Sequence, residues 1–354
     1  MRELPVIPKV SVVIPCLNEK GWIGPCLDSV LANNYPKDSL EILVVDGMSK
    51  DGTREIISDY IKRFPDGMIK LLDNVRKTQE KALNIGISHA VGDVIVRLDA
   101  HAMLSKEYIS ICTQYLREYK AGSVGGRFVT LPQQESLMGK SIAVALSEPF
   151  GVGNSFRVKK NGKPEWVDAA PYACYHREVF KRLGLYREGL EYSEDAEFYQ
   201  RMKRNGYKTL LIPDVASYYF ARSDLKSFFI HAVRNGIWAI LPAKYTGYLV
   251  VSLRHLVPLA FVSSIVASGL LALVLPEART LLASIVGAYW LTSLVFSALI
   301  AVRQGDFRYA FTMPLVFGTL HLGYGLGSLI GLMKLSFSLF SRLIPFGGRG
   351  LLLC

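Results

Sequence analysis

Short apolar runs alternate with segments of helical periodicity over the first hundred residues. The apolar runs cover residues 10–15, 41–47, 69–73 and 94–98, and their Val, Ile and Leu content is typical of buried strands. Segments with helical spacing follow the first three runs and end near residues 33, 63 and 91. This order predicts an α/β fold with a doubly wound, mostly parallel sheet.

The pattern is less regular in the next hundred residues. We expect helices over 106–119 and 177–183, a strand over 123–128, and a helix with an acidic first turn after Ser193, its expected N-cap. Residues 131–167 show no clear period and include Gly151, Gly153 and Asn154. They predict either a mobile loop over a binding pocket or a surface excursion.

A long apolar region follows. Three segments are each about as long as the ~20 apolar residues needed to cross a bilayer: 256–275, 280–302 and 310–333. The only charged residues between 256 and 333 are Glu277, Arg279, Arg303, Asp306 and Arg308. We therefore expect three membrane segments rather than buried core helices.

The segment before this region mixes aromatic and basic side chains. Residues 225–246 are typical of a helix in the membrane interface, the alternative being an amphipathic helix packed on the sheet. The expected organisation is a cytoplasmic α/β domain (1–224), an interface region (225–246), and a transmembrane domain with a short tail (247–354). Three crossings leave Lys334, Arg342 and Arg349 outside, against the positive-inside rule. The five glycines between 318 and 331 leave open a break of the third segment into a hairpin.

Composition narrows the cellular setting. No apolar stretch precedes the first strand, so we expect no cleaved signal peptide and a soluble part in the cytoplasm. The five cysteines form no close pair, which favours reduced thiols. The net charge of +11 has no nucleic-acid motif beside it, so it favours anionic lipid and diphosphate substrates over nucleic acid.

Polar residues gather where the expected strands end: Asn18, Glu19, Asp46, Asp99 and His101. Ligands of doubly wound sheets bind beyond the carboxyl ends of the strands, so these residues predict a shared pocket. Asp99 and His101 form a candidate metal site, the alternative being a helix-capping Asp beside a solvated His. The chain has no Gly-x-Gly-x-x-Gly or Walker-type loop, so neither a dinucleotide fold nor a P-loop ATPase is supported.

In order and spacing, these motifs resemble family 2 of the inverting glycosyltransferases, which have the GT-A fold. The similar segments are 12–19, 45–53 and 84–93, then Asp99-Ala100-His101 where the family usually has Asp-x-Asp, and Glu194-Asp195. With this Asp-Ala-His and its apolar C-terminal region, the chain most closely resembles the membrane-anchored, succinoglycan-biosynthesis-type branch.

The resemblance implies a role for each candidate site residue. Asp46 would accept a hydrogen bond from the nucleotide base, and Pro15, Asn18 and Glu19 would flank the same nucleoside. Asp99 and His101 would position Mn²⁺ or Mg²⁺ on the donor diphosphate, with the imidazole favouring Mn²⁺. Asp195 would be the general base, and Glu194 would hold the acceptor or orient Asp195. Processive members of the family carry a Gln-x-x-Arg-Trp motif near the membrane, and Arg234 lies at a comparable place and would bind a diphosphate. The chain does not match the rest of that motif, which implies addition of a single sugar.

The implied enzyme is a metal-dependent glycosyltransferase of the cytoplasmic membrane face. It would move one sugar from a nucleotide-sugar donor to a polyprenyl-diphosphate-linked glycan for surface or exopolysaccharide assembly. Two alternatives stay open, a polyprenyl-phosphate sugar synthase and a catalytically silent membrane anchor of a polysaccharide assembly complex. The sugar, the nucleotide base, the acceptor linkage, the oligomeric state and contact of His101 with the metal are also open.

Overall fold

The computed structural model describes residues 1–152 and 162–343 and divides into two compact units. The first, called here the sheet unit, consists of Met1–Gln133 and Leu146–Ala221. The second, called the helical unit, consists of Gln134–Ala145 and Arg222–Cys354. Each unit is described by itself.

Four parallel strands form the first half of the sheet. They are β1 (Val10–Cys16), β2 (Leu40–Asp46), β3 (Ile69–Asp73) and β4 (Val94–Arg97), in the spatial order β3-β2-β1-β4. Each lies within one residue of its predicted run, and the predicted α/β class is confirmed.

The second half of the sheet is mixed. It contains β5 (Ala102–Leu104), β6 (Ser123–Pro132), β7 (Glu165–Val167), β8 (Cys174–His176) and β9 (Thr209–Ala221). Strand β8 joins the two halves because it pairs antiparallel with both β4 and β6, and β6 runs parallel to β9. Strands β5, β7 and β8 have three residues each, which is too short for a periodic signal in the sequence.

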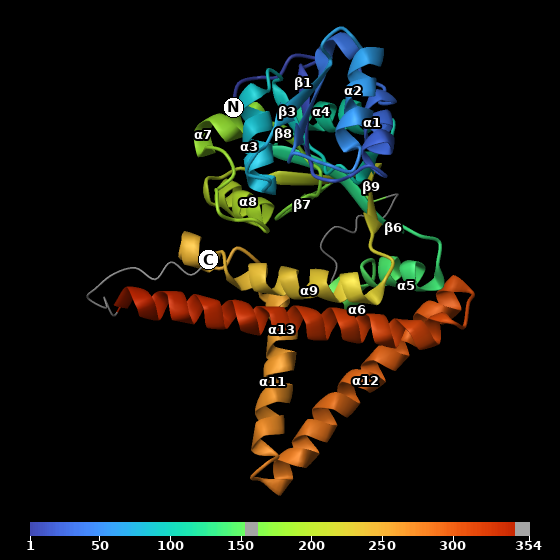
Figure 1. Cartoon of the computed structure of the whole chain (residues 1–354), viewed down its shortest axis with the longest axis vertical. Coiled ribbons are helices and arrows are strands. Elements are labelled where there is room, and N and C mark those ends of the chain that lie inside the picture. Colours follow the sequence, from blue (N-terminus) through green and yellow to red (C-terminus); the bar gives the residue numbers. More distant parts are fainter. Residues whose placement is uncertain (153–161, 344–354) are drawn as a thin grey trace. The chain divides into compact units, whose positions relative to one another are not determined.

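Helices cover both faces of this sheet (Figure 1). One face carries α1 (Ile23–Leu31), α2 (Thr53–Arg63) and α4 (Tyr108–Glu118), and the other carries α3 (Gln79–His89), α7 (Arg177–Leu183) and α8 (Glu194–Arg204). Successive strand residues alternate between the two cores, so Val12 belongs to the first and Val13 to the second. Strands buried on both faces explain the continuous apolar runs of the sequence.

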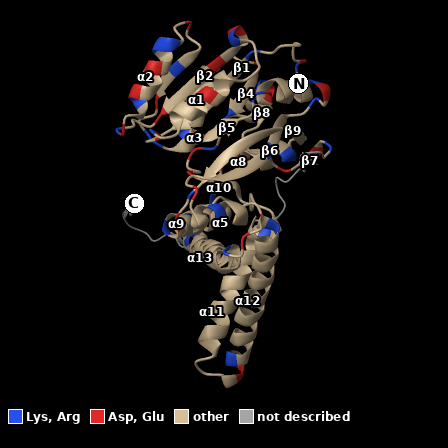
Figure 2. Ribbon diagram, turned by 90° about the vertical axis from the view of Figure 1, so that its right-hand side faces the viewer, with Lys and Arg blue, Asp and Glu red and all other residues tan. Residues whose placement is uncertain are grey.

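The helical unit contains three helices that are long and apolar enough to cross a membrane, as predicted. These are α11 (Val257–Leu271) with the 3-10 turn before it, α12 (Pro276–Gln304) and α13 (Tyr309–Leu343). They follow α9 (Leu225–Ile240) and α10 (Ala243–Thr246). In Figure 2 the α11–α12 hairpin carries Lys, Arg, Asp and Glu colours only at its tip and near its opposite end.

The break of the third apolar segment that the sequence left open does not occur, because α13 is one continuous helix. Its glycines are contact surfaces instead. A Cβ built on Gly327 would lie 2.0 Å from the carbonyl oxygen of Val233 in α9, and one on Gly325 would lie 2.3 Å from that of Pro258 in α11. Small residues of this kind let helix backbones approach closely.

The prediction of an irregular segment is also wrong for residues 137–152. They form α5 (Leu137–Ala145) and α6 (Pro149–Val152), and α5 belongs to the helical unit. The hydroxyls of Ser141 in α5 and Thr312 in α13 lie 2.7 Å apart, so tertiary contact supports a helix that local periodicity does not reveal. Residues 153–161 lie outside the described part, and the expected loop over the pocket stays a prediction.

Candidate active site

The carboxyl ends of the parallel strands enclose a cavity of about 330 Å³. Pro15 near the end of β1 and Glu19 after it line the cavity, and so do Asp99 and His101 after β4. The structure therefore brings these four predicted site residues to one cavity. The segment after β3 adds Asn74, Lys77, Thr78 and Gln79 to the wall.

The backbone around this sheet edge is unusual. Six non-glycine residues in the described part of the chain have a left-handed φ, and five of them lie in segments that border the site: Asn18 (55°), Met48 (63°), Lys77 (61°), Tyr172 (50°) and Ser193 (68°). Such conformations cost free energy and cluster at functional sites. Ser193 occupies the predicted N-cap position of α8, but its side chain makes no capping hydrogen bond.

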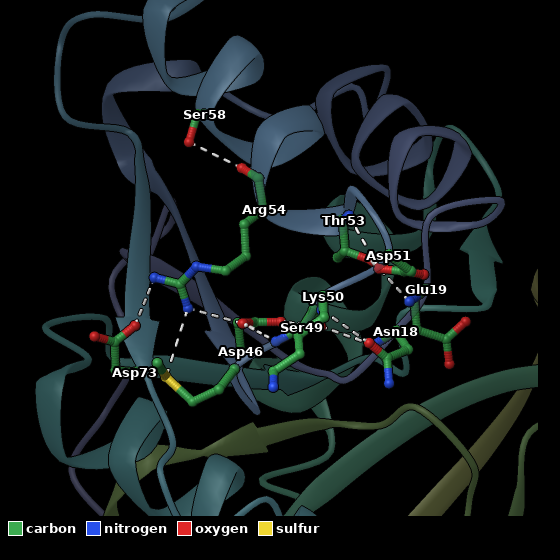
Figure 3. A network of polar contacts seen from close by, with 11 residues as sticks. Asn18, Glu19, Asp46, Ser49, Lys50, Asp51, Thr53, Arg54, Ser58 and Asp73 are labelled. Atoms are coloured by element: carbon green, nitrogen blue, oxygen red, sulfur yellow. Dashed lines mark hydrogen bonds and ion pairs between the residues drawn. The ribbon is translucent and has the colours of Figure 1, made fainter.

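Asp46 at the end of β2 is the centre of a polar network (Figure 3). Arg54 donates one hydrogen bond to Asp46 and another to Asp73, each 2.8 Å long. The backbone N–H and the hydroxyl of Ser49 donate to the same Asp46 carboxylate, which has no exposed side-chain area. The Asp46 carboxylate is therefore open to a ligand only if Arg54 or Ser49 releases it.

The loops after β1 and β2 are joined by hydrogen bonds between backbone and side chains. The N–H of Asn18 donates to the Ser49 hydroxyl at 2.7 Å, and the N–H of Lys50 donates to the Asn18 side chain at 3.1 Å. The N–H of Glu19 donates to the Thr53 hydroxyl at 2.9 Å. Figure 3 shows these contacts beside the Asp46 network, so the two loops form one hydrogen-bonded rim.

Asp99 and His101 lie in the turn between β4 and β5. The Asp99 carboxylate accepts a hydrogen bond from the side chain of Gln79 at 3.1 Å. Nδ1 of His101 lies 2.9 Å from the Glu19 carboxylate, which holds the ring orientation. Within residues 1–152 and 162–343, no group of three His, Cys, Asp or Glu side chains converges as a metal site.

Arg97 links Asp99 to the acidic pair at the start of α8. Its Nη2 lies 3.5 Å from Asp99 and 3.0 Å from Glu194, and its Nη1 lies 3.1 Å from Asp195. The Glu194 side chain is only 3% exposed, whereas that of Asp195 is 45% exposed. The structure thus gives the two adjacent acids different access to solvent.

The surroundings also separate the charge states within this cluster. Burial raises the pKa of Glu194 to about 8, against the opposite influence of Arg97. Burial disfavours the charged guanidinium, yet Asp99, Glu194 and Asp195 together hold the pKa of Arg97 well above its ordinary value. Burial thus favours the protonated form of Glu194, and the three neighbouring acids favour the charged form of Arg97.

Sequence reasoning missed several residues of this edge. Arg97 could have been found, because a charged residue at the end of a buried apolar strand indicates a functional position. Its Nε is buried without a hydrogen-bond partner, as are Oδ1 of Asn74 and Oγ1 of Thr78 in the cavity wall. Unsatisfied buried polar atoms are rare in folded proteins and suit a site that binds a polar ligand. The predicted Arg234 belongs to α9 of the helical unit, and its contact with a diphosphate stays a prediction.

The model of a protein family, glycosyl transferase family 2, matches residues 11–184. Glycosyltransferase AglE of Haloferax volcanii is 34% identical over 217 residues, which are 61% of this chain and 68% of that protein. A Methanococcus voltae protein named dolichyl N-acetyl-alpha-D-glucosaminyl phosphate 3-beta-D-2,3-diacetamido-2,3-dideoxy-beta-D-glucuronosyltransferase is 29% identical over 64% of this chain and 71% of its own length. Succinoglycan biosynthesis protein ExoA of Rhizobium meliloti is 28% identical over 65% and 73%, respectively.

One solved structure supports the fold. The mannosyltransferase PcManGT from Pyrobaculum calidifontis, in complex with GDP-Man and Mn²⁺, has a TM-score of 0.61 and 21% sequence identity. The match covers 92% of this chain and 88% of that one. The fold resemblance therefore extends beyond the sheet unit.

Proposed function

The chain belongs to glycosyl transferase family 2, and from this premise we propose that it transfers one sugar, with inversion, from a nucleotide-sugar donor to a lipid-linked glycan. The observation that carries the proposal is the position of Arg97. One guanidinium lies within 3.5 Å of Asp99, on the expected donor side, and of Glu194 and Asp195, on the expected acceptor side.

The residues on the donor side suit a divalent ion. Asp99 would hold it through a carboxylate oxygen and His101 through Nε2, because Nδ1 of His101 faces Glu19. Mg²⁺ and Mn²⁺ sites commonly take few protein ligands and complete their shell with substrate phosphates and water, which fits two protein ligands here. A bound ion would stabilise the charge of the departing nucleotide diphosphate. The Mn²⁺ in the PcManGT complex supports the same ion for this chain.

The acceptor side offers one accessible base. As the bond between the anomeric carbon and the diphosphate oxygen breaks, the acceptor hydroxyl oxygen bonds to that carbon and its proton passes to the Asp195 carboxylate. Glu194 is too buried for this task, so it would help Arg97 to orient Asp195. Pro15, Asn18 and the rim around Asp46 would flank the nucleoside of the donor.

The names of two relatives support the acceptor class. The Methanococcus voltae protein is named for action on a dolichyl-phosphate-linked sugar, and the Rhizobium meliloti protein for succinoglycan biosynthesis. Together with three apolar helices, they favour a glycan carried on a polyprenyl diphosphate at the cytoplasmic membrane face. The expected product belongs to surface or exopolysaccharide assembly.

The test is transfer of label from nucleotide-sugars to extracted membrane lipid, with and without Mn²⁺. We expect label on a lipid-linked oligosaccharide, and we expect Asp195→Asn to lower kcat by ~10²–10⁴-fold. Asp168→Asn is the matched control, because Asp168 is an exposed carboxylate paired with Lys203 outside the cluster. Full activity of Asp195→Asn would refute the base assignment.

The product distinguishes the alternatives. An acid-labile monosaccharide on a lipid phosphate, as the sole product, would identify a polyprenyl-phosphate sugar synthase instead. Absence of transfer together with absence of nucleotide binding in calorimetry would identify a silent anchor.

A further inference from the structure

The middle of α13 lies where α11 begins. Gly325 is near the midpoint of α13, and a Cβ built on it would meet the carbonyl oxygen of Pro258 and the side chain of Val262. Pro258 is the second residue of α11 and lies three positions after His255, the second member of the polar pair Arg254 and His255. A helix that crosses a bilayer has its midpoint in the hydrocarbon centre, about 15 Å from the interface where a neighbouring crossing begins. The contact with Pro258 instead puts the midpoint of α13 at that interface.

The start of α13 lies at the same level. It follows α12 after a turn that holds the ion pair of Arg308 and Asp306 at 2.8 Å, and Arg303 is in the last turn of α12. The charged turn marks the end of α12 that is opposite the hairpin tip at Glu277 and Arg279. Two points of α13, its start and its midpoint, therefore share one membrane level. Figure 1 shows α13 running across the α11–α12 hairpin rather than alongside it.

Contacts with helix α9 set the membrane depth of the C-terminal half of α13. Gly323, Gly327 and Gly331 of α13 contact α9, from Phe229 and Ala232 to Ile237. Helix α9 carries Lys226 and Arg234, which are costly in the hydrocarbon core, and its 16 residues span only about 24 Å. The two helices therefore lie together in the polar part of the bilayer.

Burial and length separate α13 from the other two apolar helices. More than half of its apolar window is buried, 56%, against 11% and 17% for the windows of α11 and α12. Its 35 residues extend over about 52 Å, far more than the ~30 Å hydrocarbon core. Between residues 309 and 338, six of the seven exposed large apolar side chains recur at alternating steps of four and seven residues along one face, and only Leu332 departs from this spacing. The six are Phe311, Leu315, Leu322, Leu326, Met333 and Phe337. We call this face the lipid stripe.

We infer that only α11 and α12 cross the membrane, and that α13 lies flat in one interface beside α9 with its lipid stripe against acyl chains. The end of α13 then stays on the side from which α11 enters the membrane. Lys334 joins Arg303 and Arg308 on that side, which removes the conflict with the positive-inside rule that three crossings create.

Single cysteines and a membrane-impermeant maleimide test this arrangement in sealed vesicles of both orientations. Cys354→Ser is the background, because the other four cysteines are buried. The exposed reporters are Lys226→Cys in α9, Thr280→Cys at the tip of the hairpin, and Ser336→Cys in α13. We expect Ser336→Cys and Lys226→Cys to react from the same side of the membrane. Thr280→Cys should react only from the opposite side. Ser336→Cys reacting together with Thr280→Cys would show three crossings and overturn the inference. All three reacting from one side would overturn it too, by showing that the hairpin does not cross.

Spin labels measure depth directly and do not depend on sidedness. Labels at Phe311→Cys, Leu322→Cys and Phe337→Cys along the lipid stripe should show one immersion depth by oxygen and nickel accessibility. The matched series on α12, at Leu281→Cys, Leu291→Cys and Val302→Cys, also occupies exposed positions and should be deepest at its middle position. A stripe that is also deepest in the middle would show a crossing α13. Gel filtration of each variant checks that it remains folded.

Discussion

The two units bring distant segments of the chain together by opposite means. In the sheet unit, a buried charged side chain does so, because the guanidinium of Arg97 lies within 3.5 Å of both Asp99 and Glu194. In the helical unit, the absence of side chains does so, because Gly327 and Gly331 let α13 approach α9 to backbone contact. The sheet unit should therefore be sensitive to changes of charge, and the helical unit to changes of volume.

The largest effect should come from Arg97→Met, which removes the positive charge and keeps much of the volume. Loss of one partner from a buried ion pair costs about 3–5 kcal/mol, and here the carboxylates of Asp99 and Asp195 lose their partner. We expect a large fall in the thermal unfolding temperature of the detergent-purified protein, together with loss of sugar transfer. Unchanged stability of Arg97→Met would contradict the contrast between the units.

A volume change should act in the helical unit. Gly327→Leu puts a side chain against the backbone of Val233, which cannot move aside as a side-chain tip can. Overpacking typically costs about 1–3 kcal/mol, and we expect a lower unfolding temperature with nucleotide binding by the remaining folded protein unchanged. Gly287→Leu is the control, since no atom lies within 4 Å of its Cβ position, and it should change stability by less than about 0.5 kcal/mol. Equal effects of the two changes would refute the role of glycine packing.

The pH dependence of stability sharpens the charge side of the comparison. Glu194 has a pKa of about 8 in the folded protein against 4.5 for an ordinary side chain. The folded state keeps a proton that the unfolded chain releases, so its contribution to stability falls as the pH rises from about 5 to 8 and then levels off. Glu194→Gln should flatten the unfolding temperature over this range. An unchanged slope would show that Glu194 ionises normally.

The smallest effect should come from His101→Asp, which exchanges an imidazole for a carboxylate. We expect the preference for Mn²⁺ over Mg²⁺ to shrink, because an all-oxygen site suits Mg²⁺ better. Mn²⁺ binding followed by electron paramagnetic resonance gives a readout that does not depend on transfer. Glu19→Gln is the companion variant, since its amide oxygen can still accept a hydrogen bond from Nδ1 of His101. Identical metal preference in His101→Asp and the wild-type protein would exclude His101 as a ligand.

Much of the sheet unit could be predicted from sequence, since runs such as 10–15 and 94–98 carry their burial in their composition. The polar residues at the strand ends could be predicted as well, because ligands of such sheets bind beyond the carboxyl ends of the strands. The structure places Asp99, His101 and Glu19 at one cavity, as this rule predicts. The role of Arg97 could not be predicted, because its partners on α8 are almost a hundred positions away in the sequence. Pairing across that distance leaves no local pattern. The three-residue strands could not be predicted either, because they are too short to show an alternating pattern and form only by pairing with neighbouring strands.

The membrane part shows a different limit. Hydropathy reports the length and polarity of a segment, so it found all three apolar helices. It does not report direction, which in α13 depends on contacts of Gly325 with α11 and of Gly327 with α9. The same glycines suggested a helix break when read from sequence, because a glycine that weakens a helix and a glycine that admits a neighbour look alike.

The α9–α13 contact also sets an order of assembly during synthesis. The α9 residues that meet α13 leave the ribosome about ninety residues before their partners, roughly 5–20 s earlier at ~5–20 residues per second. During that interval the small-residue face of α9, with Ala232 and Gly236, has no helix to cover it. The membrane surface is the natural holding place for such an amphipathic segment. Nascent chains that stop before α13 should therefore be recognised as unfinished by quality-control proteases even when their sheet unit has already folded.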